Sequence, residues 1–226
     1  MQRREGMQKL ALAALVATSF LVIFAGAVWG FRHLAIAQTQ TQSTNPSNYA
    51  LGGFPMPGNL APNFTLSDQF GHPLTLSSLR GQEVVLAFID SRCKTLCPLT
   101  STIMYNAKIQ LASPASNKIQ LIAVNANPTA TSIATVQAWS IDHGMLHQWE
   151  FLTGSAQQLQ SVYSRYNVYV KVDSNGVLEH DPIIFIIDAQ GHERLYFETL
   201  DSNSQADLKS QELGLEAGMK QWLPQS

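Results

Sequence analysis

The chain has 226 residues, enough for one domain of ordinary size plus additional segments. Its formal net charge is -2 and its pI is about 6.3, which excludes the strongly basic surface typical of nucleic-acid-binding proteins. It contains only two cysteines, too few for a disulfide scaffold or a four-cysteine zinc site. Because these two lie only four positions apart, any chemistry they carry must be that of a local pair.

The N-terminus predicts a membrane anchor. Residues 1–9 form a basic N-terminus that we expect in the cytoplasm, and residues 10–31 carry no charge. About 20 apolar residues span the hydrocarbon core of a bilayer, and basic residues upstream keep the N-terminus inside. We therefore expect a single-pass helix at 10–31 in the inner (cytoplasmic) membrane, with the rest of the chain on the periplasmic side. The alternative is a signal peptide cleaved after residues 35–37, which delivers the domain to the same side.

The composition of residues 32–58 predicts a flexible linker. This segment is rich in Gln, Thr, Ser, Asn, Pro and Gly and poor in aliphatic side chains, so it has little apolar area to bury. The folded domain is then expected over residues 59–226.

The sequence pattern of this domain predicts alternating strands and helices. Alternating apolar residues indicate a hairpin over 63–76, and the continuous apolar runs at 84–89 and 119–124 indicate strands buried on both faces. Further strands are expected at 151–152, 183–187 and 194–198, and helices at 98–112, 133–139, 156–166 and 206–223. With right-handed crossovers, this order gives an α/β three-layer sandwich that begins with a hairpin.

The two cysteines follow the first buried strand. Cys93 and Cys97 lie where a short polar loop leads into a helix, which we expect to begin near Cys93. The amides and macrodipole of a helix N-terminus favour a thiolate, and Arg92 and Lys94 add positive charge. Residues four apart on one helical face converge on one ligand, or form a disulfide if the turn deforms. Paired thiolates suit Cu(I), zinc or iron–sulfur clusters. The sequence is therefore compatible with three alternatives: a metal site, a thiol-redox site, or an inert buried pair of cysteines.

Three histidines are candidate ligands. His180 precedes Pro182, which cannot donate to a sheet and so belongs at the start of the strand at 183–187, in a tight loop where a cis bond would fit. Taken alone, His180 is more often an ordinary loop histidine than a ligand. His143 and His147 have a spacing that can bind metal, but we expect both to be solvated.

Several motifs together resemble the thioredoxin superfamily and, within it, the Sco/SenC family, over residues 61–222. Two cysteines separated by three residues and followed by Pro98 match the Sco pattern, whereas thioredoxin and TlpA-like proteins have two residues between their cysteines. The stretch at 149–154 is similar to the Trp-x-Phe-Leu-Thr-Gly sequence of Sco proteins. His180 stands eight positions before Asp188, as the copper-ligand histidine of that family does.

This resemblance implies a thioredoxin-like fold with an N-terminal hairpin extension, in which Cys93, Cys97 and His180 are the ligands of Cu(I) or Cu(II). It also favours a metallochaperone over an enzyme, and the predicted N-terminal helix would hold this protein at the membrane. The expected recipient is the copper-bearing subunit of cytochrome c oxidase or another copper protein.

A thiol–disulfide oxidoreductase is the alternative. Pro182 falls where thioredoxin and TlpA-like proteins keep a cis-proline beside the active disulfide, and residues 94–96 lack the proline and acidic residue frequent in Sco proteins. In this alternative Cys93 attacks, Cys97 resolves, and a thioredoxin-like reductant is a partner. Peroxiredoxin chemistry is disfavoured because Asp90 occupies the position where that chemistry needs a threonine.

Overall fold

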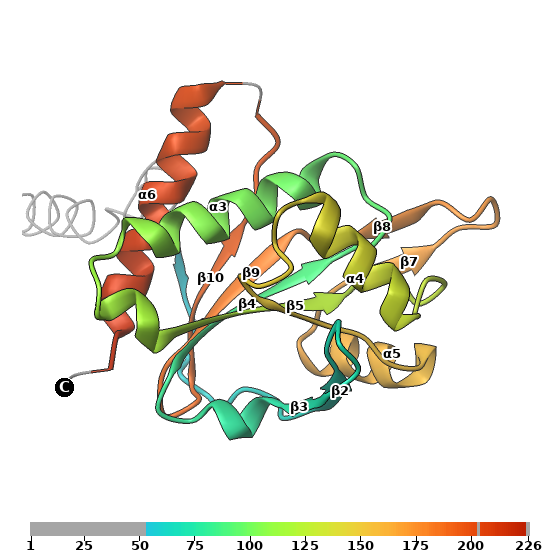
Figure 1. Cartoon of the computed structure of the whole chain (residues 1–226), viewed down its shortest axis with the longest axis horizontal. Helices are drawn as coiled ribbons and strands as arrows, with labels where there is room; N and C mark the ends of the chain where they lie inside the picture. Colours follow the sequence, from blue (N-terminus) through green and yellow to red (C-terminus); the bar gives the residue numbers. More distant parts are fainter. Residues whose placement is uncertain (1–52, 203, 225–226) are drawn as a thin grey trace, which may run out of the picture. The chain divides into compact units, whose positions relative to one another are not determined.

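The computed structural model describes residues 53–202 and 204–224. A six-stranded mixed sheet forms its centre (Figure 1). The strands lie in the order β1 (Phe54–Pro55), β10 (Glu193–Glu198), β9 (Ile183–Ile187), β4 (Glu83–Ile89), β5 (Ile119–Asn125) and β6 (Glu150–Leu152). Strands β4, β5 and β6 are parallel, whereas β9 is antiparallel to both of its neighbours.

Helices cover both faces of this sheet. One face carries α3 (Leu96–Gln110), α4 (Ile133–Asp142) and α6 (Gln205–Trp222). The other carries α5 (Ala156–Arg165), with the hairpin of β2 (Thr65–Ser67) and β3 (Pro73–Thr75) and the short helix η1 (Leu76–Leu79). The remaining elements are η2 (Ala115–Lys118), β7 (Val170–Val172) and β8 (Leu178–His180). The mixed α/β fold expected from the sequence is thus confirmed, with three layers, and the β2–β3 hairpin lies between β1 and β4 in the chain.

The central strand β4 shows why the apolar run forms a buried strand. All seven of its residues are buried. Val85, Ala87 and Ile89 pack toward α3, α4 and α6, while the alternating residues Val84 and Phe88 pack toward α5. Side chains alternate across a strand, so a continuous apolar run satisfies both faces at once. The strand therefore delivers the loop that follows it, with both cysteines, from a rigid base.

The helix after this loop begins between the two positions that the sequence indicates, Cys93 and Pro98. It starts at Leu96, so Cys97 lies in its first turn and Cys93 lies in the preceding loop rather than on the same helical face. The Asp90 carboxylate accepts a hydrogen bond from the Arg92 amide at 2.9 Å, and the Cys93 amide donates to the Asp90 carbonyl at 3.0 Å. An aspartate that binds the backbone two residues ahead favours a turn over a helix.

Three further features differ from the sequence prediction. His180 ends a short hairpin formed by β7 and β8, which the sequence does not predict. The Asp181–Pro182 bond is trans, and among the described residues the cis X–Pro bond lies at Ser113–Pro114. Strand β1 lies within the segment assigned to the linker and pairs with β10, so the folded unit begins before residue 59.

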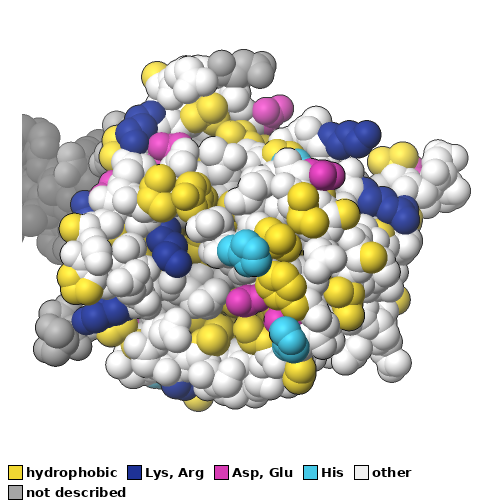
Figure 2. Space-filling model, viewed as in Figure 1, with side chains coloured by type: hydrophobic (Ala, Val, Ile, Leu, Met, Phe, Trp, Pro, Cys, Tyr) yellow, Lys and Arg dark blue, Asp and Glu magenta, His cyan; other side chains and the backbone are white. Residues whose placement is uncertain are grey.

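The predicted membrane anchor lies outside the described residues, as do the alternative cleavage site and most of the linker. Within the part of the chain that the structure describes, no helix has the length and apolar character needed to cross a bilayer. On the face shown in Figure 2, basic and acidic side chains are scattered among neutral ones and form no patch of a single sign.

Candidate metal centre

Cys93, Cys97 and His180 line one groove of about 340 Å³, which we call the His180 groove. Asp90 and Pro182 line it as well. The loop after β4 supplies Cys93, the first turn of α3 supplies Cys97, and the end of β8 supplies His180. The fold thus brings together two cysteines and a histidine that lies 83 residues beyond the second of them.

The two thiols are both free and share a hydrogen bond. The backbone amide of Cys97 also donates to Cys93 Sγ at 3.4 Å, and Thr95 Oγ1 lies 3.7 Å from the same sulfur. The hydrogen bond from the Cys97 thiol is the largest influence on Cys93 and, with the amide donors and against the effect of burial, lowers the pKa of Cys93 to about 5. The same bond, together with burial, raises the pKa of Cys97 well above its usual range.

These opposite shifts describe one pair that holds a single proton. Cys93 carries the thiolate, and the buried Cys97 keeps its thiol and donates it. The expectation that amides at the start of the helix favour a thiolate agrees with these contacts. Arg92 and Lys94 do not figure among the causes of the shift, since both side chains are exposed to solvent.

The imidazole of His180 is oriented toward the cysteines. Its Nε2 lies 3.6 Å from Cys97 Sγ, and its Nδ1 lies 3.0 Å from the carbonyl oxygen of Asp181. A ring N–H that donates to a backbone carbonyl fixes the tautomer and leaves the other nitrogen's lone pair free for a ligand. The Asp181 carboxylate in turn accepts from the Tyr169 amide at 2.8 Å and ties the base of the β7–β8 hairpin together.

The contacts run in a line from Cys93 through Cys97 to His180. No three His, Cys, Asp or Glu side chains in the described ranges gather closely enough to hold a metal ion as they stand.

Sequence reasoning missed the residues that support the site. The main-chain carbonyl of Asp181 orients His180, and the buried Trp139 indole donates from Nε1 to the Cys93 carbonyl at 3.2 Å. The sequence holds no signal for either contact, because every residue has a main-chain carbonyl and the Trp139 contact depends on tertiary packing. His143 stacks on Trp139 at 3.9 Å and is half-buried, so the expectation that it is simply solvated is wrong.

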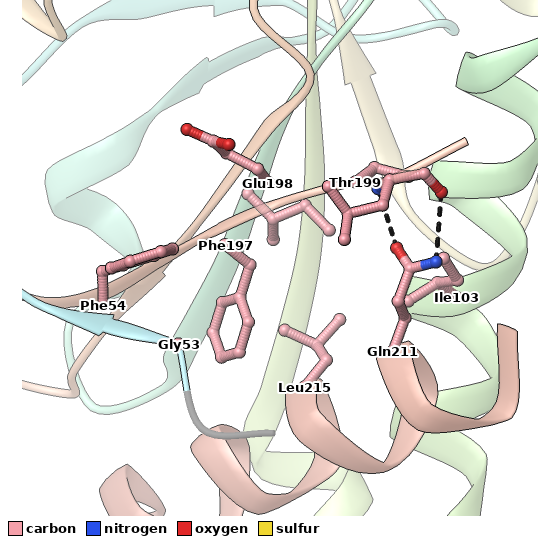
Figure 3. A pocket seen from close by; sticks show the side chains of 10 residues that line it. Gly53, Phe54, Ile103, Phe197, Glu198, Thr199, Gln211 and Leu215 are labelled. Atoms are coloured by element: carbon pink, nitrogen blue, oxygen red, sulfur yellow. Dashed lines mark hydrogen bonds between the residues drawn. The ribbon is translucent and has the colours of Figure 1, made fainter. Parts of the chain in front are cut away.

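An apolar cavity lies elsewhere and contains neither thiol nor imidazole. It encloses about 200 Å³ between β10, α3 and α6, and its walls include Phe197 and Leu215 (Figure 3). On one side Gln211 binds both the amide and the carbonyl of Leu200. Binding of a soft metal ion and thiol–disulfide exchange both use the cysteine sulfurs, so we place the candidate site at the His180 groove.

With the site described, comparison with known proteins identifies the family. The family model for SCO1/SenC matches residues 55–213, which includes both cysteines and His180. This chain belongs to the SCO1/SenC family.

Individual SCO1/SenC proteins are similar to it at moderate identity. Protein SCO2, mitochondrial, of Saccharomyces cerevisiae is 25% identical over 182 residues, which cover 77% of this chain and 58% of the yeast protein. The crystal structure of yeast Sco1 with copper bound gives a TM-score of 0.57 at 22% identity, covering 74% of this chain and 91% of that one. BsSco, described as a member of the Sco family of cytochrome c oxidase assembly proteins, gives 0.56 at 20% identity, covering 73% and 96%. These structural likenesses establish the fold. The chain spans about half the length of the curated relatives it matches.

Proposed function

We propose that this SCO1/SenC protein binds copper through Cys93, Cys97 and His180 and delivers it to the copper site of cytochrome c oxidase. The observation that carries the proposal is the meeting of two cysteines and one oriented histidine in a single groove. Copper bound to yeast Sco1 and the description of BsSco as an oxidase assembly protein support the choice of metal and recipient.

The donor set fits a soft monovalent ion. The Cys93 thiolate provides a first ligand without losing a proton, because its pKa lies near 5. Cys97 must release its proton to become the second ligand, so binding of copper would release a proton. His180 Nε2 supplies the third, and a Cys2His set of this kind suits Cu(I), while a further ligand would allow Cu(II).

The exposure of the ligands suits transfer by ligand exchange. Cys97 is 3% exposed and lies in the first turn of a helix, whereas Cys93 lies in a loop and is partly exposed. His180 is also partly exposed, at the end of a short hairpin. Ligands of a recipient protein would therefore replace Cys93 or His180 first, while Cys97 holds the ion until transfer is complete.

The location we propose follows from the N-terminal sequence. Residues 10–31 would anchor the chain in the inner membrane, with residues 1–9 in the cytoplasm, and residues 32–52 would tether the domain on the periplasmic side. Protease added outside the inner membrane should then digest the domain in spheroplasts. Protection of the domain in intact spheroplasts would contradict this topology.

Copper titration of the reduced full-length chain tests the ligand set. We expect one Cu(I) per chain, and His180→Ala should weaken the affinity by at least about tenfold, the scale on which even outer-shell partners act. His143→Ala is the matched control, because His143 is also half-buried but lies outside the His180 groove. A Cu(I) affinity of His180→Ala equal to that of the unmodified chain would exclude the three-ligand assignment.

A thiol–disulfide oxidoreductase is the second candidate. A reactive Cys93 thiolate beside a buried Cys97 thiol is the arrangement expected of an attacking and a resolving cysteine. Pro182 lines the groove, although its peptide bond is trans rather than cis. A redox titration with a disulfide-reductase assay separates the two candidates: catalytic turnover would favour the oxidoreductase, whereas a stable, substrate-inert disulfide would exclude it.

A further inference from the structure

A main-chain contact of Thr199 holds the chain just after His180. Strand β8, which ends at His180, pairs with β7 in a two-stranded sheet of their own, so the hairpin is not part of the main sheet. The chain joins the main sheet at β9, which begins at Ile183. At the junction, the Thr199 amide donates to the Pro182 carbonyl at 2.8 Å. This bond fixes the main chain two residues beyond the histidine.

The side chain of the same threonine reaches the helix that carries Cys97. Thr199 Oγ1 shares a hydrogen bond of 3.0 Å with Thr100 Oγ1. Thr100 lies three residues after Cys97, on the same face of α3, and its hydroxyl donates to the Leu96 carbonyl at 3.0 Å. Thr100 also lines the His180 groove. Thr199 therefore joins the two sides of the groove, the histidine side through its main chain and the cysteine side through its hydroxyl.

These contacts form a closed loop around two of the ligand candidates. The loop runs from Cys97 along α3 to Thr100, across to Thr199, and through Pro182 to His180. It closes where His180 Nε2 lies 3.6 Å from Cys97 Sγ. The bond between the two threonine hydroxyls is thus the cross-link that limits how far the imidazole can move away from the sulfur.

The burial of the two hydroxyls favours a positioning role over packing alone. Thr100 is 2% exposed and Thr199 is 4% exposed. Burial of a hydroxyl costs free energy unless it is bonded, and replacement of both partners by apolar groups of the same shape can be nearly neutral for stability. What the hydroxyl pair adds over two apolar side chains is a fixed direction and distance. Thr199 also borders the apolar cavity, which leaves room for its side chain to shift once the bond is lost (Figure 3).

We propose that Thr199, through its bond to Thr100, is a positioning residue of the copper site that holds His180 beside Cys97 before the ion arrives. The inference deepens the proposed function and rests on it, because it takes His180 and Cys97 as ligands. A ligand that is already in place costs less conformational entropy to order when the ion binds. Loss of the hydroxyl should therefore weaken binding although Thr199 does not itself touch the ion.

Proton NMR of the reduced, copper-free full-length chain tests the placement without the metal. A nuclear Overhauser effect should join the His180 ring protons to the Cys97 β protons, because the nitrogen and the sulfur lie 3.6 Å apart. Thr199→Val keeps the branched shape but removes the hydroxyl, so this effect should disappear. Thr199→Ser keeps the hydroxyl and should retain it. The variants should fold, because Thr100 keeps its bond to the Leu96 carbonyl and no buried hydroxyl is left unpaired.

Cu(I) titration of the same variants measures what this placement contributes to binding. Thr199→Val should weaken the affinity about tenfold, as loss of an outer-shell partner does, and Thr199→Ser should restore it. Thr102→Val is the control, because Thr102 is an exposed residue of the same helix whose hydroxyl donates to the Pro98 carbonyl, and it should bind as the unmodified chain does. The double variant of Thr100→Val and Thr199→Val should lose no more affinity than Thr199→Val alone, because the two hydroxyls act as one pair.

Retention of the Overhauser effect in Thr199→Val would overturn the inference, and so would its loss without a change in Cu(I) affinity. Equal losses in Thr199→Ser and Thr199→Val would also overturn it, since they would assign the effect to packing instead of the hydroxyl. Failure of the proposed function gives a different result. If the unmodified chain binds no Cu(I), the copper site itself is wrong, while the Overhauser effect still shows whether Thr199 holds His180 beside Cys97.

Discussion

Glu83 should make the stability of this protein depend on pH. Its carboxyl group is fully buried at the start of β4, at the opposite end of the strand from the cysteine loop, and neither oxygen has a hydrogen-bond partner. Burial, with a smaller contribution from Asp188, raises its pKa from 4.5 to about 9. Asp188 keeps its own charge beside Arg194, 2.6 Å away, so Glu83 is the member of this pair that stays protonated.

The sign and size of the effect follow from this shift. A carboxyl group with a raised pKa in the folded state contributes its full stability below the unfolded pKa and loses it as pH rises toward the folded value. Each pH unit in this window costs about 1.4 kcal/mol, so the folded state should lose about 3 kcal/mol between pH 4.5 and 7 through Glu83 alone. The amide of Glu83→Gln does not ionise, and this part of the loss should disappear.

Urea unfolding of the full-length chain at several pH values between 5 and 8 measures this effect. Unfolding free energy should fall more steeply with pH in the unmodified chain than in Glu83→Gln. Glu198→Gln, which removes an exposed carboxylate, is the control and should keep the steep dependence. Parallel pH profiles for the unmodified chain and Glu83→Gln would refute the argument that Glu83 is buried in its neutral form.

Two further predictions concern the site. Replacing Cys97 by Ala removes the hydrogen bond that most lowers the pKa of Cys93, so the pH midpoint for alkylation of Cys93 by iodoacetamide should rise from about 5. Cys97→Ser keeps a hydroxyl donor and should raise this midpoint less. An unchanged midpoint in Cys97→Ala would contradict the shared-proton pair. Asp181→Ala keeps the main-chain carbonyl that faces His180 Nδ1 but removes the carboxylate that accepts from the Tyr169 amide, so it should loosen the base of the hairpin that carries the histidine and weaken Cu(I) affinity by up to about tenfold. Asp173→Ala at the far turn of the same hairpin should leave the affinity unchanged, and equal effects of the two substitutions would show that the Asp181 carboxylate does not position the histidine.

The sequence predicts the central strands closely because their signal is local. The apolar runs at 84–89 and 119–124 correspond to Glu83–Ile89 and Ile119–Asn125, since a strand buried on both faces cannot include many polar residues. Pro182 was likewise expected just before a strand, and β9 begins at the next residue.

The errors arise where tertiary contacts decide the structure. The β7–β8 hairpin is short and half-exposed, and its two strands pair only with each other, so no apolar pattern marks it. Ile109 has helical spacing that predicts an inward side chain but is 55% exposed, because Met104 and Ala107 fill the inner face of α3 instead.

The candidate site also combines features that local sequence predicts with features that only tertiary contacts decide. The position of the cysteines after a buried strand could be predicted from local pattern. The contact between His180 and Cys97 could not be predicted from local pattern, because the two residues lie 83 positions apart and only the tertiary fold brings them together. The family resemblance alone indicated this contact. The Asp90 turn, which moved the start of α3 past Cys93, depends on one side-chain hydrogen bond.

X-ray absorption spectroscopy of the Cu(I)-loaded full-length chain tests the central claim most directly. Coordination by Cys93, Cys97 and His180 predicts two sulfur ligands and one nitrogen ligand per copper, and the nitrogen should disappear in His180→Ala while it remains in His143→Ala. A spectrum that contains only sulfur ligands, or one that His180→Ala leaves unchanged, would contradict the account.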